Sequence, residues 1–206
     1  MAERKKFIDV EIPMLASTMK ILTSENFENK TIKLDLTRKM KGKGLTITFK
    51  IFEDEKKVIA IPSRMELVKS YIRRIMRKRA DYVEDSFQIQ CADIKATIKP
   101  FLITRKKVSR AIRKNLRNTT REFLIAYVKE KNYTDICTEL KNGSLQKTML
   151  PKLKKIYPLS FCDIRVLETK EIQKIDIKTA SKEDEEAKEQ YEEEEQFVSF
   201  RKEEEE

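Results

Sequence analysis

Two arginine-rich segments carry the residues whose types and spacing point to a definite chemistry. Residues 64–79 contain seven basic side chains against one acid, Glu66, and residues 105–121 contain eight basic side chains and no acid. A guanidinium group forms paired hydrogen bonds to a phosphate and also stacks on planar groups. The two segments therefore predict a surface that binds nucleic acid.

The residues predicted to contact RNA are all basic side chains of these two segments. They are Arg73, Arg74, Arg77, Lys78, Arg79, Arg105, Lys106, Lys107, Arg110, Arg113, Lys114 and Arg117. The alternative is a solvated basic surface with no partner. The charge of residues 1–180 argues against that alternative, because 41 basic and 22 acidic side chains give a net charge of +19. Solubility of a small domain requires only about 2 to 8 charges, and a larger excess repels itself unless an anion neutralises it.

Residues 181–206 have the opposite charge. Thirteen acidic side chains stand against four basic ones, a net charge of −9. The few apolar residues are scattered among the acids, so we expect a disordered tail, with at most a frayed helix at residues 183–195. Two roles remain open for this tail: a solvated segment with no task, or a segment that competes with RNA for the basic body.

The residue types that most enzymes require are missing. The chain contains no histidine, the commonest acid–base group, and no glycine-rich phosphate loop. An RNA-cleaving enzyme with a carboxylate-bound metal would need acids within the basic surface, which is nearly free of them. The cysteines Cys91, Cys137 and Cys162 are odd in number and lack the spacing of a zinc site, so we interpret them as small buried residues. No enzyme activity, cofactor or metal is expected.

Membrane association is not expected either. The longest apolar stretches, such as residues 123–128, are far shorter than the roughly 20 residues of a membrane-spanning helix. The first residues carry charges and no apolar core of a secretory signal. The basic helices also have narrow apolar stripes, whereas a helix that lies on a membrane needs a broad one. We expect a cytoplasmic protein.

Alternating apolar residues predict a first part made mainly of strands. Strands are expected at residues 7–12, 31–37, 45–52 and 58–61, the last ending at Pro62. The second and third should form a hairpin with a basic tip, in which Gly42 and Gly44 adopt positive φ and Arg38, Lys39, Lys41 and Lys43 are candidate phosphate contacts. Ser63, followed by Glu66 three residues later, predicts the capped start of a helix.

The second part is expected to mix strands and helices. Strands are predicted at residues 87–90, 93–99, 161–167 and 172–177, and helices at 106–131, 134–140 and 145–156, with Pro151 kinking or dividing the last. Long helical crossovers do not recur between successive strands. The fold class is therefore α+β, with a mainly antiparallel sheet or partial β-barrel flanked by basic amphipathic helices.

Three stretches, in consistent order between about residues 5 and 175, resemble a known family. They are Lys-Phe-Ile-Asp-Val at residues 6–10 with Pro13 behind it; Ile-Lys-Pro at 98–100 followed by Ser-Arg-Ala-Ile-Arg-Lys at 109–114; and Ile-Tyr-Pro-Leu at 156–159. Together they resemble the eukaryotic-type S-one (S-three-A-e) family of small-subunit ribosomal proteins, in its shorter archaeal form.

The resemblance implies a structural protein with an rRNA-binding body at residues 1–180. It implies a place on the platform of the small subunit, near the 3′ end of the rRNA and the messenger exit. The implied partners are small-subunit rRNA, neighbouring ribosomal proteins and mRNA near the exit. It also implies that Arg73, Arg74, Arg77 and Arg79, with the segment at residues 110–114, form the family's basic clusters.

Two features depart from the family pattern. Residues 84–87 read Glu-Asp-Ser-Phe where the family has a Lys-Asp-Gly-Tyr-like turn, so we expect a differently shaped hairpin there, and the acidic tail matches no motif. RNA would be recognised by its shape, through phosphates and 2′-hydroxyls, with Tyr71 or Tyr82 available for stacking if they are not part of the core. The alternative function is a general DNA- or RNA-binding protein outside the ribosome.

Overall fold

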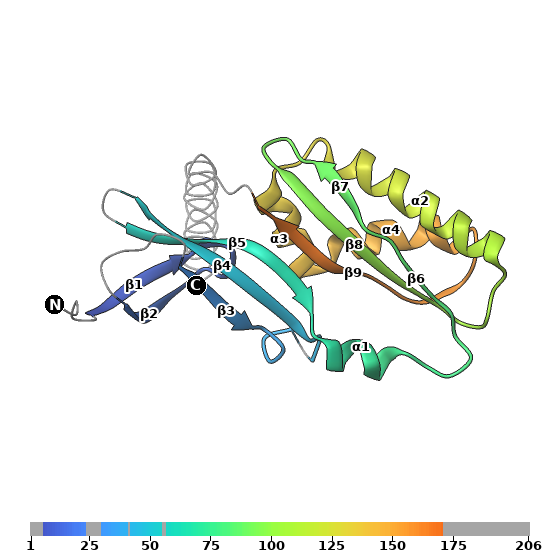
Figure 1. Ribbon diagram of the computed structural model, residues 1–206, viewed down its shortest axis with the longest axis horizontal. Coiled ribbons are helices and arrows are strands. Elements are labelled where there is room, and N and C mark those ends of the chain that lie inside the picture. The colour runs from blue at the N-terminus through green and yellow to red at the C-terminus, as the bar shows by residue number, and fades with distance from the viewer. Residues whose placement is uncertain (1–5, 24–29, 41, 55–56, 171–206) are drawn as a thin grey trace, which may run out of the picture.

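The computed structural model describes residues 6–23, 30–40, 42–54 and 57–170, and within them it has the expected α+β class (Figure 1). The strands are β1 (Lys6–Ile12), β2 (Ser17–Thr23), β3 (Thr31–Asp35), β4 (Leu45–Asp54), β5 (Lys57–Leu67), β6 (Tyr82–Glu84), β7 (Phe87–Gln90), β8 (Lys95–Thr104) and β9 (Leu159–Thr169). The helices are η1 (Pro13–Leu15), α1 (Lys69–Ile75), α2 (Arg110–Val128), α3 (Tyr133–Asn142) and α4 (Ser144–Lys154).

One mixed sheet contains all nine described strands and does not close into a barrel. Its main path runs β2-β1-β5-β9-β8-β6, while β3 and β4 extend it from β5 and β7 pairs with β8. Every described pairing is antiparallel except that of β1 with β5. The prediction of a mainly antiparallel sheet is therefore confirmed.

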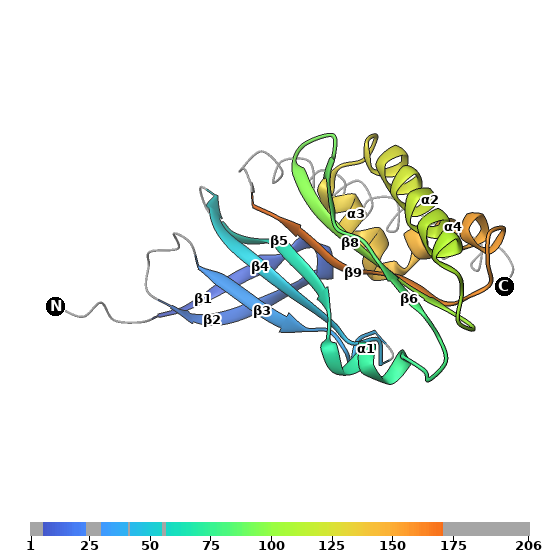
Figure 2. The same cartoon turned by 45° about the vertical axis from the view of Figure 1, so that its right-hand side comes forward.

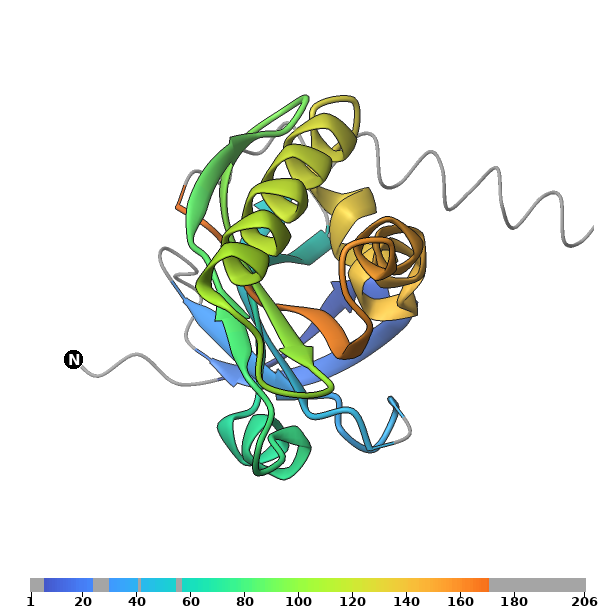
Figure 3. The same ribbon diagram turned by 90° about the vertical axis from the view of Figure 1, so that its right-hand side faces the viewer.

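The sheet consists of two halves joined through β5 and β9. Only residues 64–66 of β5 pair with β9, whereas β4 follows almost the whole of β5 on its other edge. The helices α2 and α4 lie over the half made of β6 to β9, and α3 packs beside α4 against β5 and η1 (Figure 1; Figure 3). Their buried side chains, such as Leu124 and Met149, form a common core with the strands.

The predicted helix start at Ser63 is wrong. Residues 63–66 belong to β5, which continues through Pro62 rather than ending there. Met65 and Leu67 are buried while Arg64 is exposed, so the segment has the alternation of a strand. The Ser63 hydroxyl donates to the carbonyl of Thr48 at 3.0 Å instead of capping a helix. Pairing on both edges outweighs the local capping signal, and α1 begins only at Lys69.

The predicted hairpin of β3 and β4 is confirmed, but its two glycines serve different purposes. Gly42 has φ +88, the left-handed conformation that favours glycine. Gly44 does not have positive φ; a side chain there would place Cβ 2.7 Å from Cβ of Tyr71. Gly44 is therefore needed for the close approach between the hairpin and α1.

The helices after residue 105 were largely predicted. The side chain of Ser109 accepts a hydrogen bond from the backbone N–H of Ile112 and begins α2, and Gly143, with φ +79, ends α3. Pro151 does not divide the following helix, because α4 runs through it. Strands β2 and β6 were not predicted, whereas the strand expected at residues 172–177 and the tail at 181–206 lie outside the described residues.

Candidate nucleic-acid interface

The two arginine-rich segments meet at one end of the molecule. Their link is a set of hydrogen bonds between Asp81 and Thr104, at the end where β6 pairs with β8. The backbone N–H of Thr104 donates to the carbonyl of Asp81 at 2.9 Å, and that of Asp81 donates to the Thr104 hydroxyl at 3.1 Å. The Asp81 carboxylate also accepts from the N–H of Val108 at 2.9 Å. These bonds hold the turn at residues 77–80 beside the loop at 105–109.

A third basic segment joins the other two, and sequence reasoning missed it. The backbone N–H of Arg105 donates to the carbonyl of Pro158 at 3.4 Å, which brings the turn after α4 to the same end. Lys154 and Lys155, at the close of α4, are both exposed. Two adjacent lysines just before Tyr157-Pro158 were the sequence signal for this segment.

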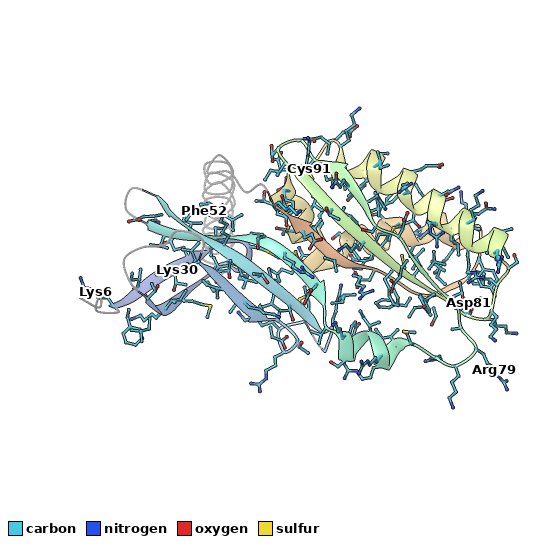
Figure 4. All side chains as sticks on the ribbon, viewed as in Figure 1. Lys6, Lys30, Phe52, Arg79, Asp81 and Cys91 are labelled. Atoms are coloured by element: carbon cyan, nitrogen blue, oxygen red, sulfur yellow. The ribbon has the colours of Figure 1, made fainter. Side chains whose placement is uncertain are left out.

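We call this region the basic end. It comprises Arg77, Lys78, Arg79, Arg105, Lys106, Lys107, Arg110, Lys154 and Lys155, all of which are exposed. None of these nine forms an ion pair with a carboxylate of the described residues. Figure 3 looks towards this end, and Figure 4 shows Arg79 beyond Asp81 at the outer margin of the molecule. The basic end therefore presents positive charge that the described part of the protein does not neutralise.

A pocket of about 410 Å³ lies between the basic segments. Arg77 and Arg105 line it from two different segments, and Thr104 and Ser160 lie beside them. The two guanidinium groups and the exposed Ser160 hydroxyl provide donors that a phosphate oxygen can accept from, whereas the buried Thr104 hydroxyl is already hydrogen-bonded to the backbone of Asp81 and Lys106.

The predicted residues on α2 separate into two groups. Arg110 and Lys114 are exposed near the start of the helix, but Arg113 is half-buried, and its Nε is buried with no hydrogen-bond partner. Arg117 donates from Nε to the carbonyl of Glu84 at 3.2 Å, so it braces the helix against β6. Of the four predicted contacts on this helix, Arg110 and Lys114 are best placed to contact a ligand.

Residues 84–87, which differ from the family's turn sequence, do not form the hairpin that we expected there. Strands β6 and β7 pair consecutively with the same edge of β8, and this segment is the break between them. Glu84 pairs with Arg165 at 3.0 Å, and the Asp85 carboxylate lies 3.6 Å from Nε of Arg121. Both acids therefore lie beside arginines of the fold, and neither pairs with a residue of the basic end.

The remaining predicted residues lie on α1 and the β3–β4 hairpin. Arg73 and Arg74 are exposed on α1, where the Arg74 guanidinium lies 5.6 Å from the ring centre of Tyr71. Arg38 and Lys39 are exposed on the hairpin, while Lys41 lies outside the described residues. Lys43 is not an available phosphate contact, because its ammonium group pairs with the buried Asp163 at 2.7 Å.

The cysteines have the properties of unreactive thiols: Cys91 and Cys137 are buried and Cys162 is partly buried. Burial raises the pKa of the Cys91 thiol to about 11 and that of Cys162 to about 12, and it raises the pKa of Cys137 further. Neutral thiols are poor nucleophiles and poor metal ligands. Within the described ranges no group of three acidic or cysteine side chains is arranged to hold a metal ion. No helix in the same ranges is long and apolar enough to cross a membrane.

The fold and the site together are those of a basic α+β protein in which nine exposed basic residues without a described ion-pair partner lie at one end. The chain belongs to the Ribosomal S3Ae family, which matches residues 3–173. This confirms the family resemblance of the three sequence stretches.

Three archaeal relatives support the same assignment, and each is named small ribosomal subunit protein eS1. The chain is 28% identical over 102 residues to that of Nanoarchaeum equitans, 24% over 106 residues to that of Archaeoglobus fulgidus and 26% over 105 residues to that of Halorubrum lacusprofundi. These alignments cover 49%, 51% and 50% of this chain. The chain spans about half the length of these curated relatives, 52%, 50% and 49% in the same order.

Proposed function

We propose that this protein is a structural constituent of the small ribosomal subunit and binds rRNA through the basic end. The observation that carries the proposal is the convergence of three basic segments at one end without a carboxylate partner among the described residues. The family and the names of the relatives supply the ribosomal context. The place within the subunit is the platform, near the 3′ end of the rRNA and the messenger exit, with neighbouring ribosomal proteins and mRNA as further partners.

The basic end suits recognition of RNA by shape. Its charges come from a turn, a loop and the end of a helix rather than from one continuous helix. Side chains arranged in this way cannot enter the deep, narrow major groove of A-form RNA, but they can follow phosphates and 2′-hydroxyls on a folded surface. Arginine forks then fix position and orientation, since phosphate contacts carry no direct sequence information.

Charge reversal at the basic end tests the proposal. Lys107→Glu combined with Arg110→Glu should weaken binding to folded small-subunit RNA by at least about a hundredfold, because two contacts to charged groups contribute about 1.5 to 3 kcal/mol each and about 1.4 kcal/mol is a factor of ten. Arg113 is left unchanged because its half-buried side chain belongs to the fold. Affinity is measured by filter binding or fluorescence anisotropy at fixed salt.

The matched control reverses two charges elsewhere. Lys33 and Lys95 are exposed on β3 and at the start of β8, so Lys33→Glu with Lys95→Glu changes the net charge equally but spares the basic end. Equal loss of affinity in the two double variants would show that only net charge matters, and the proposed interface would be wrong. Circular dichroism confirms that both variants are folded.

Salt dependence and sedimentation separate the ribosomal function from general nucleic-acid binding. If roughly six phosphates are contacted, the logarithm of affinity should fall with the logarithm of salt with a slope of about −4 to −5. The full chain should prefer folded small-subunit RNA to duplex DNA at the same salt, and in a lysate it should sediment with small subunits. Equal affinity for duplex DNA, with no protein in the subunit fractions, would support a general nucleic-acid-binding protein instead.

A further inference from the structure

A second surface with the features of a ligand site lies between the β3–β4 hairpin and α1, apart from the basic end. It is a groove of about 630 Å³, lined on the hairpin side by Asp35, Thr37 and Arg38 and on the helix side by Ser70, Tyr71 and Arg74. The hairpin and α1 lie side by side in Figures 1 and 2. The volume falls within the range of about 300 to 1,000 Å³ that small-ligand sites occupy.

The two walls of this groove are held at a fixed separation. Gly44 lets the hairpin approach Tyr71, since a Cβ there would lie only 2.7 Å from Cβ of Tyr71. The backbone N–H of Val68, just before α1, donates to the carbonyl of Gly44 at 2.9 Å. Phe161 of β9 supports the Tyr71 ring edge-on, with the ring centres 6.3 Å apart. The groove is therefore formed before any ligand binds.

The groove is lined by cationic, aromatic and acidic side chains, which suit the phosphate, the base and the N–H or O–H donors of a nucleotide. Arg38 is exposed and forms no ion pair with a described carboxylate, and Arg74 stacks over Tyr71. Tyrosine rings and guanidinium planes are both surfaces on which bases stack. Oδ1 of Asp35 accepts both hydrogen bonds from Thr37, from the backbone N–H and the hydroxyl. Oδ2 is left to accept from a ligand.

We propose that this groove binds one nucleotide of a single strand of RNA. Arg38 and Arg74 bind the phosphate from the two walls, the base lies against the surface formed by Tyr71 and Arg74, and Asp35 accepts from a base N–H or a 2′-hydroxyl. The inference rests on the proposed function, because it takes RNA as the ligand. It adds a second site, apart from the basic end, for a single-stranded part of the RNA.

A carboxylate beside two guanidinium groups argues against a site for phosphate alone. Hydrogen bonds from Thr37 lower the pKa of Asp35, so this group is ionised at neutral pH and repels an isolated anion. A nucleotide instead offers the carboxylate N–H and O–H donors together with the phosphate. Since a duplex hides its base faces in the stack, the groove should accept a single strand and reject a duplex.

The first test compares an arginine that lines the groove with a lysine of the same hairpin that does not. Arg38 lines the groove, whereas Lys33 is exposed on β3 and does not line it. In the full chain, Arg38→Gln should weaken binding of a single-stranded RNA octamer about fivefold to tenfold and leave binding of an RNA duplex nearly unchanged. Lys33→Gln, which removes the same charge, should change either affinity no more than about twofold. Equal effects of the two substitutions on the octamer would overturn the inference.

A second test locates the bound strand directly. An octamer containing 4-thiouridine is crosslinked to the full chain by near-ultraviolet light, and the modified peptide is identified by mass spectrometry. The expected crosslink lies in the peptide that contains Tyr71, and it should be reduced several-fold in Arg38→Gln. Crosslinks confined to the loop at residues 105–110 would overturn the groove while leaving RNA binding at the basic end intact. Failure of the unmodified protein to bind any RNA would instead refute the proposed function.

Discussion

A single residue of the basic end has a backbone conformation that arginine seldom adopts. Arg79 has φ +68, in the left-handed region, at the turn that precedes Asp81. An L-residue pays about 1–2 kcal/mol for this conformation relative to the right-handed one. Glycine would avoid the strain, yet an arginine occupies the position. A glycine at this position therefore tests whether the Arg79 side chain serves RNA binding or the fold.

Substitution of Arg79 by glycine should separate stability from binding. The relief of strain is partly offset by the greater entropy of glycine in the unfolded chain, about 0.5–1 kcal/mol, so the free energy of unfolding should stay level or rise by up to about 1 kcal/mol. RNA affinity should fall about tenfold or more, because one hydrogen-bonded contact to a charged group contributes about 1.5 to 3 kcal/mol. Chemical denaturation and fluorescence anisotropy measure the two effects.

Lys78→Gly provides the control at the neighbouring position. Lys78 is exposed and does not have positive φ, so glycine there should lower the free energy of unfolding by about 0.5 kcal/mol while removing the same charge. If Arg79→Gly instead destabilises the protein more than Lys78→Gly does, the side chain of Arg79 supports the fold and its proposed role is wrong.

At the scale of elements, one buried ion pair ties the β3–β4 hairpin to β9. Lys43 and Asp163 lie 2.7 Å apart, and their side chains are only 19% and 5% exposed. The other carboxylate oxygen of Asp163 accepts from the side chain of Gln146 at 2.7 Å and from the N–H of Ile164 at 2.8 Å. The hairpin, α4 and β9 therefore meet at one carboxylate, which also fixes one wall of the groove.

Removal of the lysine should be costly because it leaves the carboxylate buried without its counter-charge. Lys43→Met should lower the free energy of unfolding by about 3 kcal/mol, whereas Lys39→Met, at an exposed position, should change it by no more than about 0.5 kcal/mol. Urea denaturation followed by circular dichroism measures both. The paired variant Lys43→Met with Asp163→Leu should recover part of the loss. Equal stability of Lys43→Met and the unmodified protein would show that the pair is not coupled to folding.

Some helices and strands could be predicted from the sequence and others could not. Strong period-two or helical patterns predicted β1, β3, β4, β7 and α2, because each buries one face. The capping signal at residues 63–66 predicted a helix, but hydrogen bonds to β4 and β9 make this segment a strand. No local pattern carries that information. Strand β6, at Tyr82–Glu84, is only three residues long and depends on pairing with β8.

At the scale of the whole molecule, the sequence predicted that the surface is basic and which residues make it so. It did not predict how these residues are arranged in space. Arg77 and Lys106 are 29 positions apart, and the hydrogen bonds of Asp81 with Thr104 place their segments together. Such long-range contacts leave no periodic signal. For the same reason the sequence could not show that Arg117 braces α2 or that Lys43 pairs with Asp163, and both were expected to be available for phosphate.

Charge separation along the chain leads to a last prediction, about residues 181–206. They lie outside the described residues, but their net charge of −9 is tethered to a body of +19. A tethered anion competes at a high effective concentration. It should suppress weak binding to random RNA more than binding to a cognate site, which supplies contacts beyond charge.

Replacing the eight glutamates at 192–195 and 203–206 by glutamine tests this competition in the full-length chain. Affinity for random RNA at low salt, where charges are least screened, should rise at least about threefold, while affinity for folded small-subunit RNA rises less. The gain should also disappear at high salt, since the competing interaction is electrostatic. A control replaces the four glutamates at 192–195 alone and should give an intermediate gain. If neither variant binds random RNA more tightly than the unmodified chain, the acidic segment does not compete for the basic body, and keeping the protein in solution remains as its role.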